Sequence, residues 1–183
     1  TGVTTNSKAS ITNVSNPLYW SDGNHTFYAG YGAEMTMQTT TTGGQTVPKG
    51  VVKCKYDKSQ ALVKCTNGQW SNMSQAYMVS KTTTAPTDNV TMTFHPIMTT
   101  LEIEVMGMAG SPIYLSQVWI TIPKSLDKTY GDNGDISYFD YDINSDAVVN
   151  APTGNNAKED VIKFKFTNYE QIPAGGSVKL AMI

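Results

Sequence analysis

The sequence contains no arginine, because all 13 of its basic residues are lysine. Arginine is the side chain that most often recognises carboxylate or phosphate groups through two parallel hydrogen bonds, so binding sites of that kind are disfavoured. The chain also lacks a surplus of positive charge, since 15 acidic residues give it a formal net charge of -2. Nucleic-acid binding normally requires a basic face, and nothing in the composition supports it.

Long apolar stretches are missing as well. No run approaches the roughly 18 residues of a transmembrane helix, and the first residues lack the charged and apolar regions of a secretory signal. We therefore expect a mature or trimmed form that does not span a membrane. Charged residues make up only 15% of the chain, and Thr, Ser and Asn are plentiful, which is typical of secreted and surface proteins.

Motifs for catalysis are absent too. The sequence has no zinc-protease, nucleophile-elbow, phosphate-loop or dinucleotide-binding pattern. Its two histidines, His25 and His95, each fall in a predicted strand, where a structural role is expected. The acidic residues of Asp132–Asp135, with Asp140 and Asp142, match no calcium-loop spacing, and a polar turn beside a strand explains them more simply. We predict no enzymatic activity, no cofactor and no metal.

What the sequence does have is alternation of apolar and polar residues, most clearly in Val90–Gly107. Apolar side chains recur at every second position on both sides of Pro96, at Val90, Met92 and Phe94 and then at Leu101, Ile103 and Val105. This period places one face of a strand in a core and the other in water. Two core-building strands are predicted here, with His95 as packing, Glu102 and Glu104 on the solvated face, and Pro96 at a strand end.

Similar patterns predict about ten short strands in all and no helix longer than one or two turns. The other strands are expected at 11–14, 25–31, 51–56, 61–66, 76–81, 115–123, 136–143, 161–166 and 177–183, with a turn at 173–176. The low-complexity segment 36–46 is expected to be an exposed, mobile loop. This pattern predicts an all-β fold, an antiparallel β-sandwich, with residues 1–183 as a single domain and residues 1–9 flexible.

The two cysteines, Cys54 and Cys65, fall on the arms of a predicted hairpin. If strands 51–56 and 61–66 close near residue 59, Cys54 lies opposite Cys65 on one face. Residues that face each other across antiparallel strands are close enough for a disulfide. The pair is therefore either a structural disulfide, which would stabilise the fold by about 2–3 kcal/mol, or two free thiols.

A group of aromatic residues near the N-terminus supplies the other candidate binding residues: Tyr19, Trp20, Phe27, Tyr28 and Tyr31. Aromatic faces stack on sugars, which makes Tyr19, Trp20 and Tyr31 candidates for ligand contact. The alternative is that these side chains pack at one end of the sandwich.

Three segments, in order along the chain, resemble the core of the fimbrillin family of Bacteroidetes. They are Gln75–Ser80 (QAYMVS), Val90–His95 (VTMTFH) and Thr100–Val105 (TLEIEV). The family shows a (D/A)YM segment, a V-x-L-x-F-x-H strand and an L-x-x-x-(V/I) strand, and here a methionine replaces the leucine of the second pattern. Upstream, Pro17–Trp20 and His25–Ala29 are similar to the family's entry pattern, so that the likeness runs from residue 10 to residue 123 at least.

The resemblance implies a transthyretin-like, Greek-key N-terminal domain of a two-domain pilin, with the second domain absent here or reduced to the last strands. Such subunits are exported as lipoproteins, trimmed at the N-terminus and assembled into fimbriae by exchange of a β-strand. It therefore implies a structural and adhesive subunit at the cell surface or outer membrane, with a lipid anchor outside this chain. Other fimbrial subunits, and host proteins or glycans, are the implied partners. A surface module that binds glycans or host ligands is the alternative function.

Overall fold

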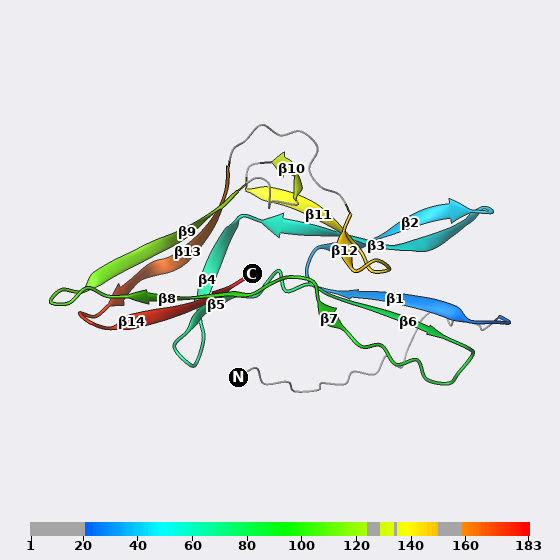
Figure 1. The fold of residues 1–183 in the computed structure, drawn as a ribbon, viewed down its shortest axis with the longest axis horizontal. Helices are drawn as coiled ribbons and strands as arrows, with labels where there is room; N and C mark the ends of the chain where they lie inside the picture. Colours follow the sequence, from blue (N-terminus) through cyan, green and yellow to red (C-terminus); the bar gives the residue numbers. More distant parts are fainter. Residues whose placement is uncertain (1–20, 124–128, 134, 150–158) are drawn as a thin grey trace.

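The computed structural model describes residues 21–123, 129–133, 135–149 and 159–183, and every helix or strand assigned in them is a β-strand (Figure 1). The all-β prediction is therefore confirmed. The strands are β1 (His25–Tyr31), β2 (Met35–Thr42), β3 (Gln45–Asp57), β4 (Ser59–Lys64), β5 (Trp70–Asn72), β6 (Met78–Thr84), β7 (His95–Pro96), β8 (Leu101–Met106), β9 (Ile113–Pro123), β10 (Tyr130–Asn133), β11 (Ile136–Asp142), β12 (Ala147–Val148), β13 (Glu159–Ile172) and β14 (Ser177–Met182). The strand predicted at 11–14 and the flexible segment predicted at 1–9 lie outside the described residues.

These strands form three sheets. The first contains β1, β6 and β7 in that order, and the second contains β10, β11, β3 and β2, with β12 beside β11. The third contains β8, β14, β5, β4, β13 and β9. Figure 1 shows the third sheet on one side of the molecule, and the strand pairs β1–β6 and β2–β3 of the other two sheets extending to the opposite side.

Most strand pairs are antiparallel, but two pairs in the third sheet are not. Strand β4 runs parallel to β13, and β5 runs parallel to β14. The sheets are therefore antiparallel, as predicted, except at these two pairings, where the late strands β13 and β14 come back beside strands from the first half of the chain. The Greek-key and transthyretin-like details, and the single domain over 1–183, stay predictions.

Two hydrophobic cores hold the sheets together. The first unites the first and second sheets through Val52, Cys54, Tyr56, Tyr77, Val79, Phe139, Tyr141 and Ile143. The second belongs to the third sheet and contains Leu62, Trp70, Phe164, Phe166, Ile172, Val178, Leu180 and Met182. Ile162 on β13 packs against both cores, so this strand connects the two halves of the molecule.

The chain passes from the second sheet to the third between β3 and β4. Lys58 lies at this crossing, where its N–H donates to the carbonyl of Asp135 and its carbonyl accepts from the N–H of Lys163, both at 2.7 Å. Before Lys58, β3 pairs with β2 and β11; after it, β4 pairs with β5 and β13. The hairpin predicted between 51–56 and 61–66 is therefore wrong, because both segments are strands but belong to different sheets.

The two cysteines consequently lie in different parts of the fold, and both are free thiols. Cys54 is buried in the first core, in register with Phe139 on β11. Cys65 is exposed just after β4, with its Sγ 3.1 Å from the Oγ of Ser71. The disulfide alternative is therefore absent from the structure, which has the second alternative, two free thiols.

We expect these thiols to differ strongly in reactivity. In the native protein, Ellman's reagent should modify Cys65 rapidly at neutral pH, because its side chain is exposed. Cys54 should react only after unfolding, since burial excludes the reagent and raises the pKa of its thiol to about 12, which suppresses the reactive thiolate. Titration should give one thiol without denaturant and two thiols with it. No reactive thiol in unfolded, unreduced protein would mean that a disulfide exists.

The stretch Val90–Gly107 differs from its prediction in its first half. Only His95 and Pro96 pair with β6, as the two-residue β7, and Phe94 is 41% exposed. The preceding residues 90–94 do not form a strand, and Thr91 meets β6 through a side chain, since its carbonyl accepts a hydrogen bond from the hydroxyl of Thr82 (2.9 Å). The second half is the predicted strand β8, and Pro96 ends β7 as expected.

The segment 36–46 is also not a loop. It contains most of β2 and the beginning of β3, which form a hairpin around Gly43 and Gly44. Both glycines have positive φ, 59° and 77°, as the tight turn of a two-residue hairpin requires. The tip of this hairpin is exposed, as predicted.

Candidate functional site

The histidines do not converge with other groups on a catalytic or metal centre. His25 Nε2 lies 3.1 Å from the carbonyl oxygen of Ser21, and His95 Nε2 lies 3.2 Å from Oδ1 of Asp146. His95 is exposed, so the prediction that it packs in a core is wrong, whereas its contact with Asp146 agrees with the structural role expected of it. Within the described ranges, no group of three or more His, Cys, Asp or Glu side chains is arranged to hold a metal ion.

The acidic residues near β11 have structural partners instead. Asp140 is buried and accepts a hydrogen bond from the Tyr130 hydroxyl at 2.7 Å. Asp142 accepts from the backbone N–H of Asn144 (2.8 Å) and from the hydroxyl of Ser145 (2.9 Å). The bond from the Asn144 N–H lowers the pKa of the Asp142 carboxyl, so it stays ionised and fixes the turn after β11.

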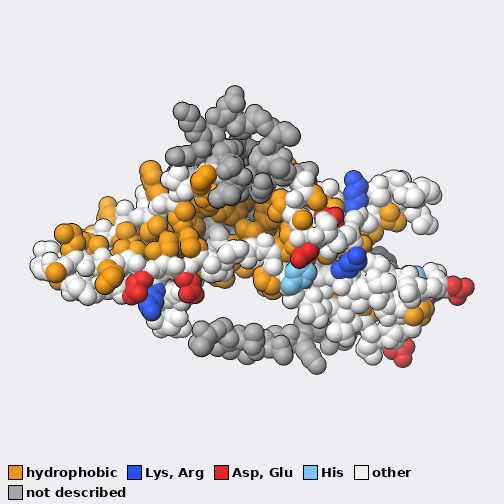
Figure 2. All heavy atoms as spheres, viewed as in Figure 1, with side chains coloured by type: hydrophobic (Ala, Val, Ile, Leu, Met, Phe, Trp, Pro, Cys, Tyr) orange, Lys and Arg blue, Asp and Glu red, His pale blue; other side chains and the backbone are white. Residues whose placement is uncertain are grey.

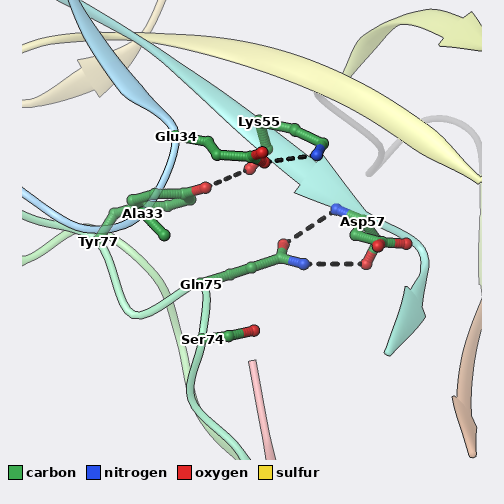
Figure 3. A pocket seen from close by; sticks show the side chains of 7 residues that line it. All are labelled: Ala33, Glu34, Lys55, Asp57, Ser74, Gln75 and Tyr77. Carbon is green, nitrogen blue, oxygen red and sulfur yellow. Dashed lines mark hydrogen bonds and ion pairs between the residues drawn. The ribbon is translucent and has the colours of Figure 1, made fainter. Parts of the chain in front are cut away.

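A small polar pocket lies beside the end of β3 (Figure 3) and is lined by Ala33, Glu34, Lys55, Asp57, Ser74, Gln75 and Tyr77. The Gln75 amide donates to the carbonyl of Asp57 (3.2 Å) and accepts from its N–H (3.1 Å), as a neighbouring strand would. Lys55 and Glu34 form an ion pair at 2.5 Å, and the Tyr77 hydroxyl donates to the carbonyl of Lys55 at 2.6 Å. These contacts fasten β3 to residues 74–77.

The electrostatics of this pocket agree with a structural role. Hydrogen bonding to Glu34 raises the pKa of Lys55, which keeps the ammonium charged. Burial raises the pKa of Tyr77 to about 12, so its hydroxyl remains a proton donor. Both groups therefore keep the protonation state on which the hydrogen bonds of this pocket depend.

The aromatic residues predicted to contact a ligand are only partly described. Tyr31 ends β1 and is 63% exposed, whereas Tyr19 and Trp20 lie outside the described residues. Tyr28 packs against the first core and donates its hydroxyl to Oδ1 of Asn144 at 2.9 Å. Packing is therefore shown for Tyr28, and a ligand contact by Tyr19, Trp20 and Tyr31 stays a prediction.

The most distinctive surface lies at the two ends of the third sheet. The buried residues of the second core all come from the four inner strands β4, β5, β13 and β14. On the two outer strands, six hydrophobic side chains pack against this core but are only partly buried: Ile103 and Val105 on β8, and Ile113, Leu115, Val118 and Ile120 on β9. We call these six side chains the apolar rim. Figure 2 shows hydrophobic side chains reaching the surface over this half of the molecule.

The rim is exposed because of the strand order. Strands β8 and β9 are the first and last of the third sheet, so each pairs on one side only within the described residues. Their side chains nevertheless pack against the same core, which means that the two ends of the sheet curl toward each other (Figure 1). The result is an incompletely covered core beside two rows of backbone groups that have no strand partner among the described residues.

The two edges differ in regularity. Strand β8 pairs with β14 in unbroken register over all six residues, from Leu101 opposite Met182 to Met106 opposite Ser177. The pairing of β9 with β13 shifts register between Lys165 and Glu170. At the same level Ser116 and Gln117 are both exposed, so the alternation of β9 is interrupted. Since such irregularities hinder the addition of a further strand, β8 is the better template.

No protein-family model, curated protein or solved structure matches this chain. The likeness to fimbrillins therefore rests on the quoted residues alone. Of those segments, Gln75–Ser80 supplies the Gln75 contact and the start of β6, and Thr100–Val105 contains most of β8. No helix in the described part of the chain is long and apolar enough to cross a membrane.

Sequence reasoning identified most of the rim residues as core but not their partial exposure. Ile103 and Val105 were assigned to a core-facing strand, as were Val118 and Ile120 in 115–123. The predicted strand begins at residue 115, whereas β9 begins two residues earlier, with Ile113 on the same face as Leu115 and Tyr114 exposed between them. The missing information is which strands are edges, because it depends on pairing and not on local pattern.

Proposed function

We propose that this chain is a non-catalytic structural and adhesive subunit of a cell-surface fimbria. It assembles by receiving a β-strand from a neighbouring subunit beside its third sheet. The observation that carries this proposal is the apolar rim between two edge strands. The order of fimbrillin-like segments in the sequence supports the cell-surface location and the choice of other fimbrial subunits as partners.

The physical reason is that an added strand would both pair with the backbone of an edge strand and cover exposed apolar side chains. Its backbone hydrogen-bonds an edge whose outer N–H and C=O groups are unpaired by any strand in the described part of the chain, and its alternate side chains cover the apolar rim. Each hydrogen bond contributes about 0.5–1.5 kcal/mol, and apolar burial contributes about 25 cal/mol per Å². A segment of six or seven residues would match the length of β8.

Uptake of a strand can be tested with the peptide VTVTVTV, which carries a Gly-Ser-Asn tail for solubility. Its valines fit the rim and its threonines are uncharged. At a concentration 100 times its dissociation constant, the peptide should stabilise the protein by about 2.7 kcal/mol. For a chain of this size that is a rise in melting temperature of about 5–10 °C, which thermal unfolding would show, with a 1:1 complex in native mass spectrometry.

The control is the same peptide with every amide N-methylated, which keeps the side chains but cannot form a β-ladder. It should leave the melting temperature unchanged. If the unmodified peptide has no larger effect than this control, and the protein also stays monomeric at high concentration, assembly by strand uptake is wrong.

A further inference from the structure

We infer that the incoming strand pairs with β8 and carries basic side chains on its outward face, selected by Glu102 and Glu104. This inference rests on the proposed function and specifies the partner. Glu102 and Glu104 are both exposed and occupy the face of β8 opposite Ile103 and Val105. A strand that added to this edge would place its own outward side chains directly beside these two carboxylates.

Strand β14, which already pairs with one edge of β8, shows which residue pattern fits beside this strand. On β14, Val178 and Leu180 are buried and lie in register with Val105 and Ile103. Lys179 between them points outward, in register with Glu104. The neighbour of β8 thus has the pattern apolar–Lys–apolar, which covers the core on one face and meets a carboxylate on the other.

The charge on this edge is not balanced by β14. Lys179 is the only charged residue of β14, and it stands in register with one of two glutamates. Glu102 lies in register with Ala181, which has no charge to offer. Glu104 accepts a hydrogen bond from Ser177 Oγ at 2.5 Å, which holds its carboxylate on this face. The edge therefore retains a net negative charge toward a strand added on its open side.

Three peptides of identical length distinguish the possibilities: VKVKVKV, VTVTVTV and VEVEVEV, each with the same uncharged tail. For the unaltered chain at low salt we expect VKVKVKV to bind about tenfold more tightly than VEVEVEV, because two cross-strand pairs change from attractive to repulsive. VTVTVTV should lie between them. The difference should shrink in 0.5 M salt, since exposed charges are screened. Isothermal titration calorimetry gives the three affinities.

Variants at the two glutamates test whether the preference for the lysine peptide arises at β8. In Glu102→Gln/Glu104→Gln the three peptides should bind with similar affinities, and glutamine still offers an acceptor to Ser177. In Glu102→Lys/Glu104→Lys the order should reverse, with VEVEVEV binding best. Circular dichroism checks that each variant is folded, and the glutamine variant suffices if lysine opposite Lys179 prevents folding.

The outcomes separate this inference from the function on which it rests. Equal binding of all three peptides to the unaltered chain would keep strand uptake but overturn selection by Glu102 and Glu104. A preference for VKVKVKV that persists in the glutamine variant would place the selective charges elsewhere and overturn the inference as well. Failure of every peptide to bind, with the protein monomeric at high concentration, would overturn the proposed function itself.

Discussion

Replacing Phe164 with alanine is expected to lower the free energy of unfolding by about 3–5 kcal/mol. Phe164 is 1% exposed and sits in the second core, in the middle of β13. It lies in register with Val118 of β9 on one side and with Gln60 of β4 on the other. The strand that carries Phe164 is paired on both sides, with β4 and β9. The backbone therefore has little freedom to move into the cavity that removal of the ring would leave.

The matched control is Lys165→Ala, at the next residue of the same strand. Lys165 is exposed on the outer face of the third sheet, so its truncation should change the stability by no more than about 0.5 kcal/mol. Urea unfolding measures both variants, and an unchanged m-value would show that the denatured state is comparable. Similar losses for the two variants would mean that β13 does not bury the face assigned to it. Phe164→Leu gives a milder version if the alanine variant does not fold.

Strands of this kind are also the part of the fold that the sequence pattern predicted best. In 115–123 and 161–166 one face lies in a core, so that burial imposes a period of two on most of the side chains, whereas in 136–143 Asp140 is buried as well. The structure has these as β9, β11 and β13, with bounds that differ by a few residues. Local alternation is sufficient where one face of a strand is buried.

Alternation failed where burial does not decide the structure. The segment 36–46 has few apolar residues and was predicted to be a loop, yet its threonines are β-branched and extend the β2–β3 hairpin. Residues 90–94 alternate well but form no strand, and Thr91 contacts β6 through the hydroxyl of Thr82. The local sequence pattern does not show which strand a segment pairs with.

The same limit applies to the candidate site. That β4 pairs with β13, about a hundred residues later in the chain, leaves no trace in either segment. The free edges of β8 and β9 follow from this order, and so does the partial exposure of the apolar rim. The sequence indicated the hydrophobic side chains and the two glutamates of β8, and only the topology shows that they lie at an edge.

Substituting Gly50 with alanine is the second change for which we expect a large loss, about 2–4 kcal/mol of unfolding free energy. Gly50 is buried in β3, where the pairing with β2 shifts register, and its φ of 73° is unfavourable for any residue with a Cβ. An added Cβ would lie 2.4 Å from Nδ2 of Asn144 and 2.7 Å from Cε1 of Tyr28. Relief of these contacts would move the segment whose carbonyl accepts from the N–H of Ile143.

Gly44→Ala separates the effect of the positive φ from that of the close contacts around an added Cβ. Gly44 has a similar φ of 77°, but no atom lies within 4 Å of the position that its Cβ would occupy. Its substitution should therefore cost only the backbone strain, about 1–2 kcal/mol. The difference between the two variants in urea unfolding measures the close packing of β3 against Tyr28 and Asn144. Equal losses would show that β3 has room at Gly50, and that its glycine is needed only for the turn of the backbone.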